Sequence, residues 1–442
     1  MSESSTNARL LRWSGRVADL TAADRRALFD RALGVDPAIR ARTADIVRQV
    51  REGGDVVLRS LALAFDGVSL DALEVPRAAW LSALDALEPT RRRSMERAIA
   101  NIERVHRAFL PVPQETESEP GIVIGRRPDP LARVGVYAPG GRAAYPSSVL
   151  MGIVPARVAG VGEVVLCSPP DRATGRPADV VLAAAAMAGA DRVFALGGAG
   201  AIAAMAFGTS SVPRVDRIVG PGNAYVAEAK LQVASAVAID SPAGPSELLV
   251  LCDASADPVV VVREMLAQAE HDPLAAVVAI TDNDRQARYI VAELSKQLAS
   301  QPRGVIAAEA LAGQGAVLVV ADLDEGIAVA NTYAAEHLLL LVAEPETVLA
   351  RLRSAGTVFI GASSSVAFGD YMTGANHVLP TGGLARSYSG LSTLDFVRWT
   401  TWQRVSPAAA ARLASDVGTF ADAEGLPAHA ATARAWRGGD AS

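Results

Sequence analysis

Histidine is scarce in this sequence, and most of its occurrences lie beside groups that could share a metal ion or a proton. The 442 residues hold five histidines, at positions 106, 271, 337, 377 and 429. His106 lies in the amphipathic segment NIERVHRAF, where we expect a structural histidine at the surface or half-buried. The other four have carboxylate or amide side chains within a few residues, so they define the candidate chemistry.

The segment MLAQAEHD combines an amide and an imidazole at helical spacing. Gln268 and His271 are three residues apart on a predicted helix, so both side chains face the same way and could bind one metal ion. An ordinary helix surface is the alternative, since glutamine is an uncommon zinc ligand. The spacing alone leaves both interpretations open.

Glu336 and His337 lie in NTYAAEHLLLL, where a helical segment passes into an apolar strand, a boundary at which α/β proteins often build sites. A carboxylate beside an imidazole offers two proton acceptors of different basicity, which suits two successive proton transfers. A solvated glutamate next to a histidine with satisfied hydrogen bonds is the alternative.

Two further segments carry polar groups in loops or turns. Asp370 and His377 lie in the glycine-rich segment FGDYMTGANHVLPTGG, and Glu424 and His429 lie in AEGLPAHA. Polar side chains in such loops are often positioned for function. A ligand set of glutamine, aspartate and two histidines, without thiolates, suits zinc and could accommodate manganese or cobalt. The sequence therefore predicts a metal site but leaves the metal open.

The segment LGGAGAIAA is one candidate for nucleotide binding. Gly198, Gly200 and Ala203 give it the spacing G-x-G-x-x-A between a predicted strand and a helix. The acidic residue expected at the end of the next strand is missing, because Asp216 opens its strand instead. The dinucleotide-binding fingerprint is therefore incomplete.

Two other glycine-containing loops are better candidates for nucleotide binding. VYAPGGR and VGPGNAY each lead into a predicted helix, whose free N–H groups can bind phosphate. A plain turn is the alternative for either loop. The residues singled out in them are Tyr137, Gly140, Gly141, Gly220, Gly222 and Asn223.

The stretches between these motifs predict an α/β fold. Short apolar runs alternate with alanine-rich helical ones, first RVGVYA, EVVLCS, RVFAL and RIVG, then ELLVLCD, AAVVAITD, AVLVVAD and LLLLVAE. Such alternation favours parallel sheets covered by helices. We expect two Rossmann-like parallel-sheet domains, over 127–240 and 241–382, with no exact repeat to prove duplication.

The two ends of the chain are predicted to be helical. Residues 1–126 form a helical region that we expect to pack on the second α/β domain, and 111–130 are expected to be a linker with a short IVIG strand. Residues 383–442 form a tail that becomes helical from Pro407. Because this tail is too short to fold alone, it must pack on its own subunit or on a partner.

Composition excludes several classes of protein. A net charge of -6 without a long basic cluster argues against nucleic-acid binding, although 91–93 form a small basic run. The most apolar stretches, such as 180–190, are too short to span a bilayer. The N-terminus lacks the features of a secretory signal, so we expect a cytoplasmic protein. Cys167 and Cys252 lie in apolar segments and are expected to be buried structural thiols.

Several of these motifs resemble one known family, the histidinol dehydrogenases. The resemblance rests on VYAPGGRAAYPSSVLM, VDRIVGPGNAYVAEAK, IDSPAGPSELL, AQAEHDPLA, AAEHL, GDYMTGANHVLPTGGLAR and AEGLPAHA, which occur in this order. It covers about 19–437. It implies an NAD- and zinc-dependent homodimer in which the tail, 383–442, is exchanged between subunits.

The resemblance also implies roles for individual residues. Zinc would be held by Gln268, His271 and Asp370 of one subunit and by His429 of the partner subunit. Glu336 and His337 would be the acid/base pair. The substrate-binding residues would be Ser246, Gln268, His271, Glu336, His337, Asp370, His377, Glu424 and His429.

The resemblance is less complete for the residues that would bind the cofactor. NAD would be contacted by Tyr137 and Asn223. Members often carry glutamine where this chain has Gly200, so a cofactor contact made by that side chain is absent here. The segment VRWTTWQRV is rich in tryptophan, and it predicts packing and no particular function.

The family reaction is the oxidation of L-histidinol through L-histidinal to L-histidine, with two NAD reduced in turn. One alternative is a related dehydrogenase acting on another polar alcohol, such as a sulfonated diol, with the same metal and acid/base pair. A second is a zinc hydrolase in which Glu336 activates a metal-bound water, which would leave the two glycine-containing loops unexplained. A binding protein without activity would leave the acid/base pair without a role.

Overall fold

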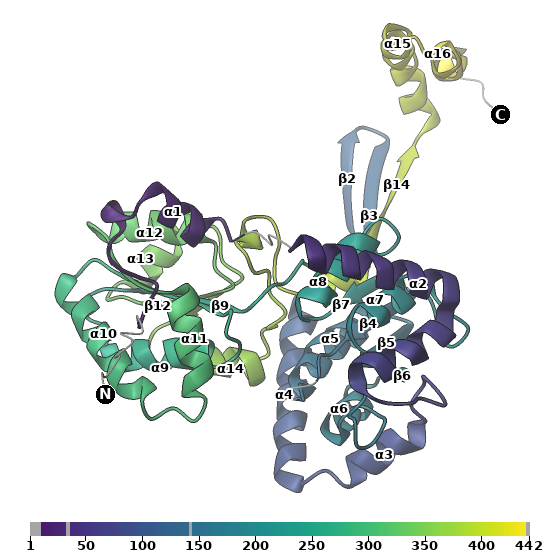
Figure 1. Ribbon diagram of the computed structural model, residues 1–442. Helices are drawn as coiled ribbons and strands as arrows, with labels where there is room; N and C mark the ends of the chain where they lie inside the picture. Colours follow the sequence, from purple (N-terminus) through teal and green to yellow (C-terminus); the bar gives the residue numbers. More distant parts are fainter. Residues whose placement is uncertain (1–9, 32–35, 141–143, 439–442) are drawn as a thin grey trace, which may run out of the picture.

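The computed structural model describes residues 10–31, 36–140 and 144–438, which form two parallel sheets, an antiparallel arm and a helical tail (Figure 1). The two parallel sheets confirm the α/β fold expected from the sequence. Within these ranges, no helix is long and apolar enough to cross a membrane.

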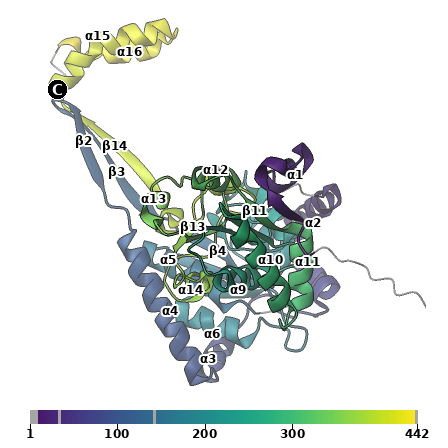
Figure 2. The same cartoon turned by 90° about the vertical axis from the view of Figure 1, so that its left-hand side faces the viewer.

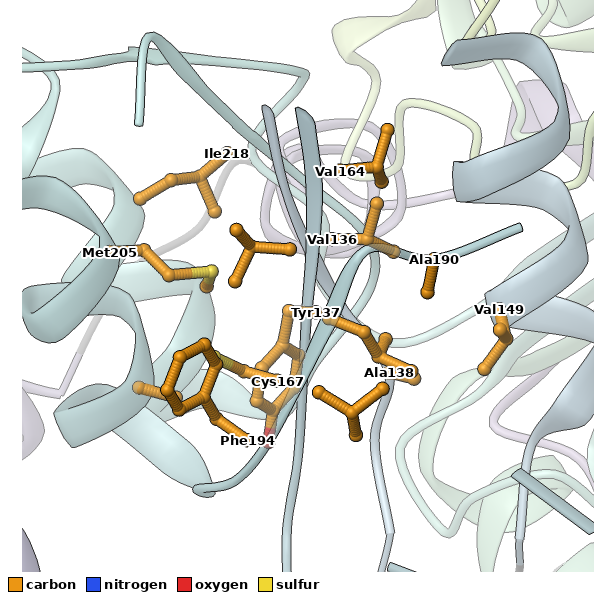
Figure 3. Packing of buried hydrophobic residues seen from close by; sticks show 14 of the residues in the cluster. Val136, Tyr137, Ala138, Val149, Val164, Cys167, Ala190, Phe194, Met205 and Ile218 are labelled. Atoms are coloured by element: carbon orange, nitrogen blue, oxygen red, sulfur yellow. The ribbon is translucent and has the colours of Figure 1, made fainter. Parts of the chain in front are cut away.

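The first parallel sheet has five strands, and helices cover both of its faces. In sheet order the strands are β6 (Arg192–Ala195), β5 (Glu163–Ser168), β4 (Arg133–Tyr137), β7 (Arg217–Val219) and β8 (Ala238–Ile239). The helices are α5 (Pro146–Ala159), α6 (Asp179–Ala188), α7 (Gly198–Phe207) and α8 (Ala224–Val233). Figure 3 shows Met205 of α7 and Val149 of α5 on opposite sides of β4. The strand is therefore buried on both faces, as its continuous apolar run predicts.

The second parallel sheet has six strands. In sheet order they are β1 (Trp13–Arg16), β11 (Gly315–Val319), β10 (Ala276–Thr281), β9 (Glu247–Cys252), β12 (His337–Leu341) and β13 (Thr357–Ile360). The helices are α9 (Pro258–Ala269), α10 (Asp284–Leu298), α11 (Gly304–Gln314), α12 (Leu323–Tyr333), α13 (Pro345–Leu349) and α14 (Val366–Tyr371). Leu248 and Val250 of β9 join one core, whereas Leu249 and Leu251 join another. This alternation shows that both faces of the sheet are covered.

The N-terminal helices correct one expectation, because most of them pack on the first sheet and not on the second α/β domain. They are η1 (Val17–Asp19), α1 (Ala22–Phe29), α2 (Pro37–Leu61), η2 (Ala62–Asp66), α3 (Arg77–Asp85) and α4 (Pro89–Ala108). Helix α2 contacts α7 and α8, α3 contacts α6, and α4 contacts α5, while β1 and α1 join the second sheet. Helical periodicity reveals that one face is buried, but not which neighbour buries it.

The segment expected to be a linker with a short IVIG strand forms an antiparallel arm, and the IVIG residues are the start of its strand β3. Strand β3 (Ile122–Pro130) pairs with β2 (Gln114–Glu119) on one edge and with β14 (Val397–Val405) on the other. A Cβ on Gly125 would overlap the ring of Trp402, and the guanidinium of Arg126 lies 4.3 Å from the ring centre of Trp399. The tryptophan-rich segment is therefore a packed strand of this arm, preceded by η3 (Leu384–Arg386) and η4 (Thr393–Phe396).

The helical tail lies beyond the tip of the arm, away from both parallel sheets, as Figures 1 and 2 show. Helix α15 (Pro407–Ala423) packs on α16 (Pro427–Arg434) and on η5 (Ala435–Gly438). Arg412 of α15 donates a hydrogen bond to the backbone oxygen of Pro120 at the turn of the arm. Several apolar side chains of the tail are exposed, among them Val417 at 45%, Phe420 at 71% and Trp436 at 40%.

Candidate active site

Most of the predicted site residues lie where the two parallel sheets meet, and the two sheets contribute opposite edges. Tyr137 ends β4 and Val219 ends β7, so the first sheet presents its carboxyl edge. Glu247 begins β9 and His337 begins β12, so the second sheet presents its amino edge. In most open α/β sheets ligands bind at the carboxyl edge. The second sheet departs from that rule.

The backbone of Glu247 holds both members of the Glu336–His337 pair, and all three residues are buried. Its N–H donates to Oε2 of Glu336 at 2.6 Å, and its carbonyl oxygen lies 3.0 Å from Nδ1 of His337. Because a carbonyl oxygen can only accept, Nδ1 carries a proton. The other ring nitrogen, Nε2, is buried without a hydrogen-bond partner in the described part of the chain. That nitrogen is therefore the one free to exchange a proton with a bound molecule.

Glu247 is fixed in turn by a buried ion pair that the sequence did not reveal. Nε and Nη2 of Arg31 donate to its two carboxylate oxygens, each at 2.9 Å. The Arg31 guanidinium also lies 3.3 Å from the ring centre of Tyr333, and the N–H of Gly382 donates to the Glu247 carboxylate at 2.9 Å. Since 216 positions separate Arg31 from Glu247, no local spacing could have predicted the contact.

The electrostatics of the site centre on one carboxylate, Asp370. Burial alone would lower the pKa of His337, but the carboxylates of Glu336 and Asp370 outweigh burial and raise the pKa to about 10. Burial alone would raise the pKa of Asp370, but His337, His377 and His271 outweigh it and lower the pKa. Burial is the main cause of the lowered pKa of His377. Asp370 therefore interacts electrostatically with three imidazoles, those of His337, His377 and His271.

Donors that fit a zinc ion come from Gln268 in α9, from His271 two residues beyond the end of α9, and from Asp370 in α14. The helix predicted to carry both Gln268 and His271 thus ends before His271. Nδ1 of His271 lies 3.0 Å from the backbone oxygen of Ala267, which leaves Nε2 available as a ligand. The amide nitrogen of Gln268 is buried without a partner among the described residues, and a half-turn of the amide would place its oxygen there. Within the described ranges, no three His, Cys, Asp or Glu side chains already surround a metal position.

The loop that carries His377 is held by the first sheet's helices. Nδ1 of His377 lies 2.8 Å from the backbone oxygen of Asp370, its hydrogen-bond acceptor. Asn376, the neighbouring residue, is buried and donates to the backbone oxygen of Met151 in α5 at 2.8 Å. The position of His377 therefore depends on both halves of the molecule.

Glu424 and His429 are not brought to this site within one chain. Both are exposed, and both lie in the tail, which Figures 1 and 2 show far from α9 and α14. Ser246, in contrast, lies directly before Glu247, and its carbonyl oxygen accepts the N–H of Ala276 at 3.0 Å. The backbone of Ser246 is thus anchored to the second sheet at the edge of the site.

Tyr137 is buried, and Figure 3 shows its ring packed near Cys167 and Phe194. Its hydroxyl accepts the N–H of Gly198 at 3.1 Å, which fixes the start of α7. Burial raises the pKa of Tyr137 to about 12, so the phenol stays protonated. The ring itself has little surface left for a ligand.

The other residues proposed for the cofactor differ in their exposure. Asn223 is exposed and caps α8, because its Oδ1 accepts the N–H groups of Tyr225 at 3.1 Å and Val226 at 3.2 Å. A Cβ at Gly200 would lie 3.1 Å from Leu61 of α2, so that position faces a neighbouring helix. Gly141 lies outside the described residues.

Two other sequence expectations concern residues away from the site. Cys167 and Cys252 are buried free thiols, as expected, and burial raises the pKa of both. His106, expected at the surface or half-buried, is 1% exposed. His106 lies on the one buried face of α4, four residues after Ile102 and eight after Ala98, which are also buried.

The fold and the site together define an α/β protein with a buried carboxylate–imidazole pair between two parallel sheets. A family model described as histidinol dehydrogenase matches residues 31–437. The chain is 48% identical over 94% of its length to the histidinol dehydrogenase of Natronomonas pharaonis, of which it covers 97%, and 44% identical over 92% to that of Methanothermobacter thermautotrophicus, of which it covers 95%.

The structure agrees with these sequence relatives. The crystal structure of histidinol dehydrogenase from Elizabethkingia anophelis superimposes with a TM-score of 0.91 at 32% identity, over 96% of this chain and 98% of that one. This chain belongs to the histidinol dehydrogenase family. The family resemblance noted from the sequence motifs is thereby confirmed.

Proposed function

We propose that this protein oxidises L-histidinol through L-histidinal to L-histidine, the last step of histidine biosynthesis, with two NAD reduced in turn. It would act as a cytoplasmic homodimer with one zinc ion per subunit. The observation that carries the proposal is the buried Glu336–His337 pair beside Asp370, in which Nε2 of His337 has no hydrogen-bond partner among the described residues.

The residues proposed to hold zinc are Gln268, His271 and Asp370, together with His429 of the partner subunit. Bound zinc would supply positive charge that holds the nitrogen atoms of the substrate and orients its carbinol carbon. A cation at Asp370 would also offset the carboxylate that raises the pKa of His337. The neutral ring, which can accept a proton, would then be favoured.

The acid/base pair would act in sequence. Nε2 of His337 would accept the proton of the substrate hydroxyl, and NAD, when bound, would supply the acceptor for the hydride of the carbinol carbon. Glu336 would then remove a proton from the water that attacks the aldehyde carbon, and the resulting hydrate would be the substrate of the second oxidation, for which a second NAD would be the acceptor. Ser246, His377 and Glu424 would contact the substrate.

NAD is proposed to bind at the carboxyl edge of the first sheet, between β4 and β7. The chain passes from β4 to β5 and β6 on one side and then to β7 on the other, so the loops after β4 and β7 diverge there. Such a crevice is the usual dinucleotide site of open α/β sheets. Asn223 opens α8 at this edge, and a helix N-terminus attracts phosphate. Because the ring of Tyr137 is buried, Tyr137 would contact NAD through its backbone.

The proposed dimer follows from the position of the tail. Glu424 and His429 are too remote to reach the site of their own chain (Figures 1 and 2). The exposed side chains of Phe420 and Trp436, at 71% and 40%, offer an apolar surface that a second copy could cover. A two-fold dimer would bring each tail to the other subunit's site.

The test is the absorbance of reduced nicotinamide after mixing the enzyme with L-histidinol and NAD. We expect about two NADH for each histidinol consumed, because the oxidation removes four electrons. Turnover with a sulfonated diol and none with histidinol would favour the related dehydrogenase. No reduction of NAD with any alcohol, together with metal-dependent hydrolysis, would contradict the proposal and favour a hydrolase.

A further inference from the structure

A buried ion pair, Lys230–Asp240, lies directly beneath the loop proposed to bind NAD. Lys230 is 1% exposed and Asp240 is 8% exposed, and Nζ of Lys230 contacts Oδ1 of Asp240. Lys230 lies in α8, and Asp240 follows β8 in the segment that leads to the second sheet. Neither residue belongs to the catalytic or metal-binding groups described above.

The pair holds both polar groups of one peptide residue, Gly220. Oδ2 of Asp240 accepts the N–H of Gly220 at 2.7 Å, and Nζ of Lys230 donates to the carbonyl oxygen of Gly220 at 3.1 Å. Nζ also donates to the carbonyl oxygen of Ser241 at 3.2 Å. With Asp240, these contacts use all three N–H groups of the lysine.

Gly220 is a position where the backbone needs such support. Its φ is +115°, and a Cβ there would lie 2.1 Å from the carbonyl oxygen of Tyr137, so the chain passes very close to the end of β4. Gly220 begins the loop that leads to Asn223 and α8. The pair therefore fixes the direction in which the N-terminus of α8 points.

Stability alone does not account for this pair. Removing two charges from water is strongly unfavourable, and apolar residues of similar volume often stabilise a fold as well or better. A loop that must present N–H groups to a phosphate, however, gains affinity when it is held in the binding conformation beforehand.

We propose that Lys230 and Asp240 are positioning residues for the diphosphate of the dinucleotide, because they hold Gly220 and so preorganise the loop from Gly220 to Asn223. This inference rests on the proposed function. Through Ser241 the same lysine ties the cofactor loop to the segment that reaches Ser246 and Glu247. This contact thereby fixes the position of the proposed cofactor site relative to that of the proposed substrate site.

The test measures NADH binding by fluorescence titration, which needs no turnover. Lys230→Met leaves Asp240 buried without its partner and is expected to lower both the thermal midpoint and the NADH affinity. The double variant Lys230→Met with Asp240→Leu removes both charges. We expect the double variant to regain much of the thermal midpoint, yet to bind NADH about ten-fold more weakly than the unaltered protein.

Arg192→Met is the matched control, because it breaks the ion pair of Arg192 with Glu74 at the start of β6, outside the site. NADH binding by this variant should be unchanged. If the double variant binds NADH as tightly as the unaltered protein, the positioning role is wrong while the proposed function stands. If the unaltered protein itself fails to bind NADH, the proposed function fails, and the role of the pair fails with it.

Discussion

The carboxylate of Glu264 in α9 accepts a hydrogen bond from the backbone N–H of Val366, the first residue of α14, at 3.1 Å. Helix α9 carries Gln268 and ends at Ala269, two residues before His271, and α14 carries Asp370. This single contact therefore joins the two elements that supply the proposed zinc ligands of one chain.

Replacing Glu264 should weaken zinc binding without removing a ligand. Glu264→Leu removes the acceptor for Val366, so α14 can shift, and losses of 10- to 100-fold in metal affinity are typical when a supporting contact is removed. Glu264→Gln keeps an acceptor oxygen and should retain affinity close to that of the unaltered protein. Competition with a chromophoric chelator measures the dissociation constant. Equal zinc affinity in the leucine variant would show that α14 does not need this contact.

Glu336→Gln should impair the second oxidation more than the first. The amide keeps the size of the side chain and can still accept the N–H of Glu247, but it cannot take a proton from water. We expect oxidation of histidinal to slow by about 100- to 10,000-fold, whereas His337 still serves the first hydride transfer. Single-turnover kinetics with histidinol and with histidinal separate the two steps. An unchanged rate with histidinal would rule out Glu336 as the base for water attack.

His106 should make the protein less stable in acid. Burial lowers its pKa from 6.5 to about 4, so between these values the unfolded chain binds a proton that the folded chain does not. The associated stability is present above pH 6.5 and is lost as pH falls towards 4, by at most about 3 kcal/mol.

The variant His106→Leu isolates this effect. We expect the thermal midpoint of the metal-free protein to fall when the pH is lowered from 7.5 to 5, values roughly above and below the usual pKa of histidine. This fall should be smaller in the variant than in the unaltered protein. Because the other histidines are common to both proteins, the difference reports on His106. Parallel decreases would show that His106 is protonated as readily when folded as when unfolded.

Subunit mixing tests whether the tail serves the partner. His271→Ala and His429→Ala should each give inactive homodimers, because every site loses a proposed zinc ligand. In a mixed dimer one site combines both defects, and the other combines intact copies of both residues. Random reassortment makes about half of the dimers mixed, so activity should return to roughly a quarter of that of the unaltered protein. No recovery, despite proven subunit exchange, would mean that His429 does not complete a partner's site.

The sequence was most informative where a segment is both apolar and bounded by glycine or charge. Runs such as 163–168 and 247–252 became strands β5 and β9, since residues buried on both faces of a parallel sheet read as continuous apolar stretches. The sequence pattern did not predict strands β1 and β2, because neither is a continuous apolar run. Their residues, WSGR and QETESE, are largely exposed, and they are strands because a neighbouring strand pairs with them.

Within the site, the sequence could show which residues were candidates but not how they are supported. Short motifs pointed to Glu336, His337 and Asp370, because each motif keeps its chemistry within a few residues. The contacts of Arg31 with Glu247 and of Lys230 with Gly220 depend on chain folding and on burial. No spacing rule reports such contacts, since arginine and lysine are usually found at the surface.

The edge strand β1 has a consequence for how the chain is made. All strands of the first sheet lie between Arg133 and Ile239, so that sheet can assemble once its own segment has left the ribosome. Strand β1 cannot pair until its partner strand has been synthesised, because that strand begins at Gly315 and Trp13 pairs with Ala316. Strand β1 is therefore synthesised well before the strand that it pairs with, and a chain that stops before Gly315 leaves β1 unpaired and exposed to aggregation.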